Sequence, residues 1–133
     1  MNSLIGIWLF TAIIYQGQQT PPPNPALKLH FIFLSATQNE VHYYRQNERG
    51  YCRRWATYRI ENSYLYQEVT EVDPDNDASC AGDTDMQKGN ISKTFFELKD
   101  EKFYLHLPLG DEGIQYIFTK EISAARSTSS FAN

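Results

Sequence analysis

Short runs in which apolar residues alternate with polar or smaller ones recur along the chain, separated by turn-forming residues. The clearest run covers residues 27–35, where Leu27, Leu29, Phe31 and Phe33 fall on one face. A period of two is typical of a half-buried β-strand, and no later segment has a sustained helical period. The pattern therefore predicts an all-β protein. The other predicted strands cover residues 5–16, 40–46, 51–61, 64–72, 91–98, 102–107 and 113–119.

The N-terminal run, residues 4–14, is apolar and has the length of a signal peptide. It is too short to span a bilayer, which takes about 20 residues. No Lys or Arg precedes Lys28, and no small-residue cleavage site follows the run, so it lacks two marks of a secretory signal. We predict a first strand here and keep a signal peptide as the alternative. Alternation from Trp8 then directs Phe10, Ala12 and Ile14 inward.

The connections between strands predict how the sheet closes. Eight successive strands joined mostly by tight turns indicate an antiparallel up-and-down barrel, which removes exposed sheet edges. A single domain is expected over residues 1–133, with strands within 5–119 and a polar tail over 120–133. The connections at one end are short, whereas loops 17–26 and 73–90 share the other end. That loop-rich end is the predicted ligand entrance. In the NERG hairpin, Gly50 is expected to take a positive φ.

The two cysteines test this arrangement. Cys52 begins one predicted strand, and Cys80 lies in the long loop after its antiparallel neighbour. Both thiols are therefore expected at the entrance, close enough to form a disulfide. The bridge would close a loop of about 29 residues and contribute about 3 kcal/mol. It would also place the protein outside the reducing cytoplasm, in a secreted or periplasmic location.

The predicted barrel interior combines apolar walls with a few polar groups, which is typical of sites for small ligands. Arg45 and Arg54 are expected toward the upper or middle cavity, where arginine could pair with an anionic group. Candidate ligand-binding residues are Phe31, Phe33, Tyr43, Arg45, Arg54, Tyr58, Gln67, Phe96, Leu105 and Tyr116.

Three segments resemble the lipocalin-like branch of the calycin superfamily. Residues 4–8 (LIGIW) look like the family's G-x-W motif, residues 29–33 like its second strand, and residues 58–65 like a Y-x-I-x-x-x-x-L hairpin. The resemblance covers residues 4–119 and implies a lipocalin-like barrel that binds a small hydrophobic or amphipathic molecule. The family's usual C-terminal helix has no convincing counterpart in residues 120–133.

The same resemblance implies a role for the start of the first strand. Gly6 would let the chain bend into the strand, and Trp8 would close the barrel floor against Phe118. Family members usually place a basic residue from the end of the last strand over this tryptophan. Lys120 is the nearest match here, and Arg126 is the fallback.

Charge and motif content exclude several function classes. The net charge is −4, and the only adjacent basic pair is Arg53 and Arg54, which argues against a nucleic-acid partner. No nucleophile elbow, phosphate-binding loop or dinucleotide fingerprint occurs, so neither an enzyme nor a cofactor is expected. No membrane span is expected either.

Metal binding is not expected. The three histidines lie on different predicted strands without metal-ligand spacing. Asp73, Asp75 and Asp77 open like a calcium loop, but Ala78 and Thr84 occupy positions that need Gly and Glu. A calcium site of another type, made with Asp83 and Asp85, is an alternative to a plain solvated loop.

The aromatic content keeps a second function open. Aromatic residues make up 14% of the chain, enough bulk to fill a barrel whose interior is only wide enough for side chains or one small ligand. A filled barrel would favour a protein-interaction module that uses loops 17–26 and 73–90. The sequence does not decide the ligand or the oligomeric state.

Overall fold

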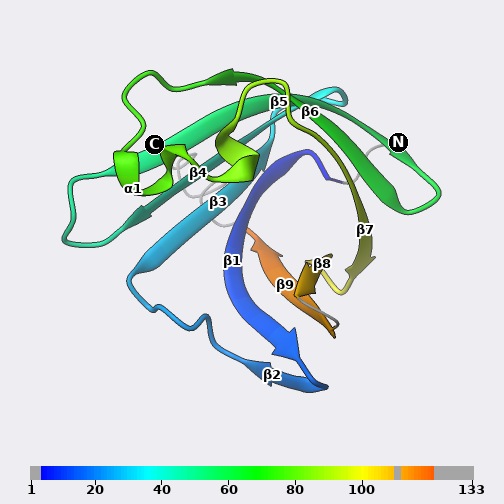
Figure 1. Ribbon diagram of the computed structural model, residues 1–133. Helices are drawn as coiled ribbons and strands as arrows, with labels where there is room; N and C mark the ends of the chain where they lie inside the picture. Colours follow the sequence, from blue (N-terminus) through cyan, green and yellow to red (C-terminus); the bar gives the residue numbers. More distant parts are fainter. Residues whose placement is uncertain (1–3, 110–111, 122–133) are drawn as a thin grey trace, which may run out of the picture.

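In the part of the chain that the structure describes, nine strands form one antiparallel sheet, and eight of them close into a barrel. The computed structural model describes residues 4–109 and 112–121 (Figure 1). The strand order is β2-β1-β3-β4-β5-β6-β7-β8-β9, with β1 also paired to β9. The strands are β1 (Gly6–Tyr15), β2 (Gln18–Thr20), β3 (Leu27–Phe33), β4 (Gln38–Arg45), β5 (Tyr51–Glu61), β6 (Tyr64–Val72), β7 (Ile91–Lys99), β8 (Lys102–Leu109) and β9 (Glu112–Lys120).

This architecture confirms the predicted all-β, up-and-down barrel. The N-terminal apolar run forms strand β1, which pairs with β3 on one side and β9 on the other. The predicted tail begins later than expected, because Lys120 still belongs to β9; residues 122–133 lie outside the described part of the chain. No helix of the described residues is long and apolar enough to cross a membrane.

Tight turns with positive φ at both central residues join several strands. Asn62 and Ser63 have φ values of 53° and 68°, and Asp100 and Glu101 have values of 53° and 65°. Such turns match the right-handed twist of the strands they connect, so they fix the hairpin register. A similar turn at residues 16–17 folds β2 back onto β1. The prediction that residues 17–26 form only a loop was therefore wrong for Gln18–Thr20.

Gly50 is required for a different reason from the one predicted. The positive φ in the β4–β5 connection belongs to Asn47, at 71°. A Cβ on Gly50 would instead lie 2.6 Å from Cγ of Asp77. The missing side chain thus lets the segment after β6 pack against the β4–β5 hairpin.

A β-bulge changes which β1 side chains face the interior. Phe10 pairs with Phe118, but the next regular pairs are Ala12 with Ile117 and Ile13 with Tyr116, so the register shifts at Thr11. Cross-strand partners share a face of the sheet, and Tyr116 packs against the core. The prediction that Ala12 and Ile14 face inward was therefore wrong, because one extra residue reverses the alternation.

The closed end of the barrel is a packed aromatic floor. Trp8 is 2% exposed, its indole N–H donates to the Leu4 carbonyl oxygen at 2.8 Å, and its ring meets Phe103 edge to face at 5.7 Å. The ammonium of Lys120 lies 5.4 Å from the centre of the indole, as the family resemblance implied. Phe118 packs on Phe103 in the same cluster and faces Phe10 across the strands. The indole therefore contacts Phe103 and lies in one buried cluster with Phe118.

Gly6 makes room for this arrangement. Its φ is 136°, a conformation that L side chains rarely adopt, and an added Cβ would lie 2.9 Å from Cε of Lys120. A side chain at this position would both strain the backbone and push the lysine off the indole.

Candidate functional site

The inner wall at the mouth of the barrel carries five half-buried hydrophobic side chains, here called the mouth cup. They pack against the core yet keep part of their surface in solvent, whereas Phe31, Phe103 and Phe118 below them are at most 4% exposed. Solvent therefore reaches the inside of the barrel at its mouth but not at its floor. The mouth cup consists of Phe10, Leu29, Tyr43, Leu107 and Tyr116.

Strand pairing holds the cup together. Leu29 and Tyr43 face each other across β3 and β4, near the mouth ends of both strands. Phe10 and Tyr116, on β1 and β9, stack with ring centroids 4.6 Å apart and an interplanar angle of 17°. Aromatic and aliphatic groups thus come from opposite sides of the barrel, as in pockets for small apolar molecules.

Residues 73–90, here called the lid loop, close one side of the mouth. The loop contains α1 (Ala78–Ala81) and a short 3-10 helix (Thr84–Met86), which lie beside β5 and β6 (Figure 1). The sequence predicted this segment as loop alone, because two such short helices leave no periodic pattern. Cys80 and Met86 are 7% and 2% exposed and join the barrel core. The lid loop is therefore a folded part of the barrel's packing.

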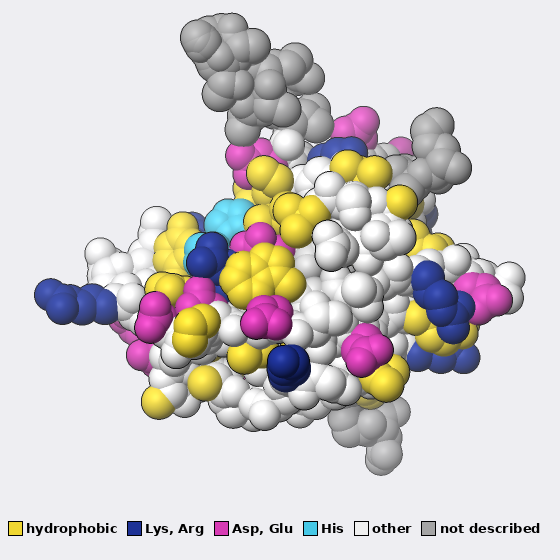
Figure 2. All heavy atoms as spheres, turned by 90° about the horizontal axis from the view of Figure 1, so that it is seen from above, with side chains coloured by type: hydrophobic (Ala, Val, Ile, Leu, Met, Phe, Trp, Pro, Cys, Tyr) yellow, Lys and Arg dark blue, Asp and Glu magenta, His cyan; other side chains and the backbone are white. Residues whose placement is uncertain are grey.

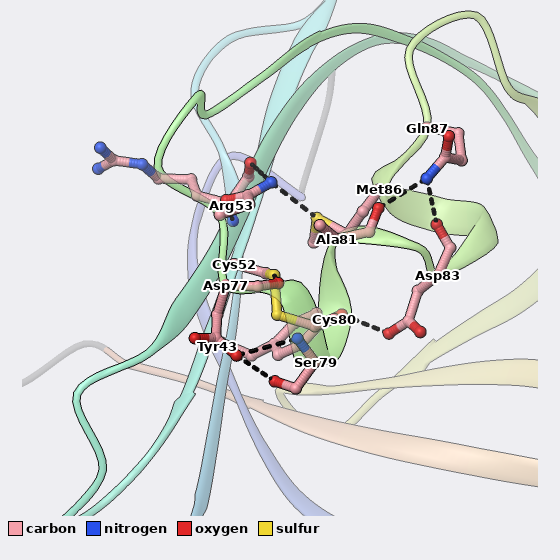
Figure 3. Close-up of a disulfide and its surroundings, with 11 residues drawn as sticks. Tyr43, Cys52, Arg53, Asp77, Ser79, Cys80, Ala81, Asp83, Met86 and Gln87 are labelled. Atoms are coloured by element: carbon pink, nitrogen blue, oxygen red, sulfur yellow. Dashed lines mark hydrogen bonds between the residues drawn. A yellow bond between two sulfur atoms is a disulfide. The ribbon is translucent and has the colours of Figure 1, made fainter.

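The predicted disulfide fixes the lid loop to the barrel wall. Cys52 on β5 is bonded to Cys80 on α1, with the Cα atoms 6.2 Å apart (Figure 3). This confirms the pairing expected from the antiparallel arrangement of β5 and β6. Because Cys52 is fully buried, the link reaches from α1 into the core.

The start of the lid loop is paired to β5 through side chains. Asn76 accepts from the backbone N–H of Arg53 at 2.8 Å and donates to its carbonyl oxygen at 3.2 Å, which imitates a strand partner. The Asp73 carboxylate accepts from the backbone N–H of Asp75, the Arg53 guanidinium and the Tyr51 hydroxyl. These bonds, the one from Asp75 foremost, hold the pKa of Asp73 below its usual range.

The other acidic residues of the loop have roles in its own structure. The Asp77 carboxylate accepts from the Ser79 backbone N–H at 3.0 Å and caps α1. Asp83 accepts from the hydroxyl of Tyr43 at 2.7 Å, which joins the lid loop to the mouth cup. Burial, together with this hydrogen bond, raises the pKa of Tyr43, so the phenol stays a neutral donor. In the described ranges no three His, Cys, Asp or Glu side chains form a group suited to a metal ion.

A buried arginine packs against the barrel core. Arg54 is 3% exposed. Its guanidinium donates to the amide oxygens of Asn39 at 2.6 Å and Gln67 at 3.2 Å, and it lies 5.7 Å from the ring centre of Phe31. Asn39 also donates to Gln67 at 2.8 Å, which closes a polar triad. Burial lowers the pKa of Arg54 to about 10, and its Nε has no hydrogen-bond partner among the described residues.

The structure divides the predicted ligand-binding residues into groups. Tyr43 and Tyr116 lie in the mouth cup, and Arg54 and Gln67 belong to the triad. Tyr58 on β5 donates its hydroxyl to the Ser35 carbonyl oxygen at 2.6 Å and so joins β5 to the β3–β4 turn at the closed end. The remaining apolar members lie in the packed core: Phe31, Phe33, Phe96 and Leu105.

Arg45 does not join Arg54. It is exposed at the end of β4 and lines a surface cavity of about 280 Å³ together with Asp77. Sequence reasoning also missed Asn39, which precedes the predicted strand over residues 40–46 but lies in β4 and is fully buried. Leu29 lies on the predicted apolar face of residues 27–35, and its position near the mouth end of that strand is the signal that would have added it to the site.

The outer face of the barrel is mixed in character. His30 and His42, on β3 and β4, have ring centroids 6.1 Å apart, and Tyr44 extends this row. The Arg53 guanidinium lies 5.1 Å from the ring centre of Trp55. Figure 2 shows hydrophobic, charged and histidine side chains interspersed on the face seen from above. Such mixing is ordinary for a solvated barrel wall. The mouth cup is therefore a stronger candidate for a ligand-binding site than the outer face.

Comparison with solved structures supports this description of the fold. The chain is similar to a lipocalin-like protein from Bacteroides uniformis ATCC 8492, with a TM-score of 0.62 and 14% sequence identity. The match covers 90% of this chain and 100% of the other. The sequence has no significant match to a family model or to a curated protein. The protein thus has a lipocalin-like fold: a closed, eight-stranded antiparallel barrel.

Proposed function

We propose that the protein is a binding protein, not an enzyme, and that it holds one small hydrophobic or amphipathic ligand in the mouth cup. The half-exposed hydrophobic ring above a packed floor carries this proposal. Apolar surface gains about 25 cal/mol for each Å² removed from water. A ligand that covered these five side chains would therefore be stabilised by removing their apolar surface from water.

The lid loop supports the same function. Tyr43 belongs to the cup and bonds to Asp83 of the lid loop, so a ligand in the cup would contact a side chain that holds the lid in place. Because the floor is filled by Phe31, Phe33 and Phe103, the ligand is expected near the mouth and not along the whole barrel axis. The fold adds a rigid frame, on which loops commonly form binding sites.

The disulfide supports a location outside the reducing cytoplasm, secreted or periplasmic. Cys52 and Cys80 account for both cysteines of the chain, and structural disulfides persist mainly in oxidising compartments. Such a location suits a carrier that meets its ligand outside the cell or in the cell envelope.

Filling the cup tests the proposed function. The probe is N-phenyl-1-naphthylamine, a neutral apolar dye that fluoresces when it leaves water. In Leu29→Trp the larger ring is expected to occupy the cup and weaken dye binding about tenfold or more, since a buried Leu-sized contact contributes about 1.5–3 kcal/mol. Ile91→Trp is the matched control, because Ile91 is 74% exposed and lies outside the cup. Dye titration measures the affinity, and thermal melting checks that both variants fold.

Two outcomes would contradict the proposal. Equal affinity of folded Leu29→Trp and the unaltered protein would remove the mouth cup as the site. The absence of dye binding to the unaltered protein would instead favour an interaction module that uses loops 17–26 and 73–90.

A further inference from the structure

Two histidines face each other on the outer wall of the barrel. His30 on β3 pairs directly with His42 on β4, and their ring centroids lie 6.1 Å apart with an interplanar angle of 25°. Both residues are half-buried. Directly opposed residues on one face of a sheet have Cβ atoms about 4.5–5.5 Å apart. The strand register therefore brings together two imidazoles that have no metal-ligand spacing in the sequence.

The ring nitrogens of this pair are free to take a ligand. Among the described residues, only His106 of the three histidines has a hydrogen-bonded ring nitrogen, which lies 3.1 Å from the Glu97 carboxylate. The rings of His30 and His42 pack instead against the ring of Tyr44, with centroids 6.2 Å and 5.5 Å away. These contacts orient the imidazoles without using their nitrogens.

The charges beside the pair can accommodate a cation. Glu40 lies two residues before His42 on the same face of β4, and Arg53 on β5 pairs with His42 across the sheet. The Arg53 guanidinium lies 2.9 Å from the Asp73 carboxylate and 3.9 Å from that of Glu40. Two carboxylates therefore offset the one guanidinium that faces the histidines.

The protonation state of the pair also suits a metal. Burial foremost, and then the charge of Arg53, lowers the pKa of His42. Its imidazole is therefore neutral at neutral pH and keeps a lone pair for coordination. Lys28 lies two residues before His30 on β3, but a lysine side chain is long enough to keep its ammonium in solvent.

We propose that His30 and His42 together bind one divalent transition-metal ion of the zinc or copper type on the outer wall of the barrel. Imidazole suits these ions. When two imidazole nitrogens bind one ion at about 2.0–2.1 Å, the ring centres lie about 5–6 Å apart, close to the observed 6.1 Å. Rotation about χ2, a broad torsion in histidine, would turn one nitrogen of each ring toward the ion.

The proposed site has two protein ligands, and water completes its coordination sphere. The described residues contain no group of three His, Cys, Asp or Glu side chains suited to a metal. Open coordination positions are typical of zinc sites other than the closed, four-ligand structural ones. The ion would link β3 to β4 outside the barrel, so the site is separate from the mouth cup and does not depend on the proposed ligand-binding function.

Zinc titration of matched variants tests the inference. Tag-free, oxidised protein is titrated with ZnCl2 by calorimetry at neutral pH, and NMR follows the imidazole ring protons. One ion per chain is expected, with shifts at His30 and His42. His30→Gln and His42→Gln should each weaken zinc binding about tenfold or more, because even the groups that orient a metal ligand are worth about 10–100-fold in affinity. His106→Gln is the matched control and should keep the affinity.

Ion selectivity separates this site from the acidic lid loop. Copper(II) should bind more tightly than zinc at a site of imidazole nitrogens, as the general order of divalent affinities requires. Calcium, which takes oxygen ligands, should not displace the zinc. Displacement by calcium would instead place the ion on the carboxylates of residues 73–90 and overturn the proposal.

The remaining outcomes are equally decisive. Absence of zinc binding, or equal affinity of both histidine variants and the unaltered protein, would overturn the site. Weaker binding in only one variant would show that the two imidazoles do not share an ion. Thermal melting checks that the variants fold, and the NMR shifts of the unaltered protein decide the matter if one does not. Dye binding in the mouth cup should be the same with and without zinc, so each proposal can fail alone.

Discussion

Trp8→Ala is expected to lower the free energy of unfolding by about 3–5 kcal/mol, the usual cost of deleting a buried large aromatic side chain. Small domains have only about 5–15 kcal/mol in total, so the variant should unfold at much lower urea concentration. The indole is 2% exposed, meets Phe103 edge to face, and donates to the Leu4 carbonyl oxygen. Its removal leaves a cavity in the floor and frees the start of β1.

Trp55→Ala is the matched control for this experiment. Trp55 is half-buried on the outer face, where Arg53 lies over its ring, so its loss should cost only about 1 kcal/mol. Lys120→Ala should cost about 0.5–2 kcal/mol through loss of the cation–π contact. Because Trp8 lies at the closed end, the folded fraction of Trp8→Ala should bind the dye as the unaltered protein does. An unchanged unfolding midpoint in Trp8→Ala would contradict the packed floor.

Removal of the disulfide is expected to have the second-largest effect. The double variant Cys52→Ala, Cys80→Ala should lose about 3 kcal/mol of unfolding free energy, because the bridge no longer restricts the loop between the two cysteines in the unfolded chain. The sequence separation of the two cysteines is 28 residues. Alanine avoids placing a hydroxyl at the fully buried position of Cys52. Urea unfolding with and without dithiothreitol measures the effect, and only the unaltered protein should respond to the reductant.

Loss of the disulfide should loosen the lid loop more than it loosens the barrel strands. In the double variant, the backbone amides of residues 73–90 are expected to exchange with solvent faster, while those of β3 and β4 stay protected. Equal exchange of the lid loop in both proteins would show that Met86 and the Asp73 and Asn76 hydrogen bonds hold it without the disulfide.

Most of the barrel could be predicted from the sequence, because its signals are local. Alternation located the strands, and the Asn62-Ser63 turn fixed one hairpin. The antiparallel pairing of neighbouring strands predicted the disulfide between Cys52 and Cys80, and the family resemblance predicted that Lys120 lies over Trp8. Each of these depends on spacing within one strand or between two neighbouring strands.

The details of the site depend on features without a local signal. One extra residue at Thr11 rotates the rest of β1, and no residue type marks a bulge reliably. Met86 fills the core from a segment that reads as a polar loop. Arg54 and Arg45 alternate with their neighbours in similar ways, yet one is buried and the other exposed. The difference arises from position along the barrel axis, which is set by the pairing of all the strands.

The binding site itself can be located by nuclear Overhauser effects between N-phenyl-1-naphthylamine and the methyl groups of the protein. If the ligand lies in the mouth cup, the aromatic protons of the dye should contact the methyls of Leu29 and Leu107. They should not contact those of Leu65, which is fully buried near the closed end, or of Ile91, which is 74% exposed. Contacts to Ile91 without contacts to Leu29 and Leu107 would place the dye on the outer wall and contradict a site inside the barrel.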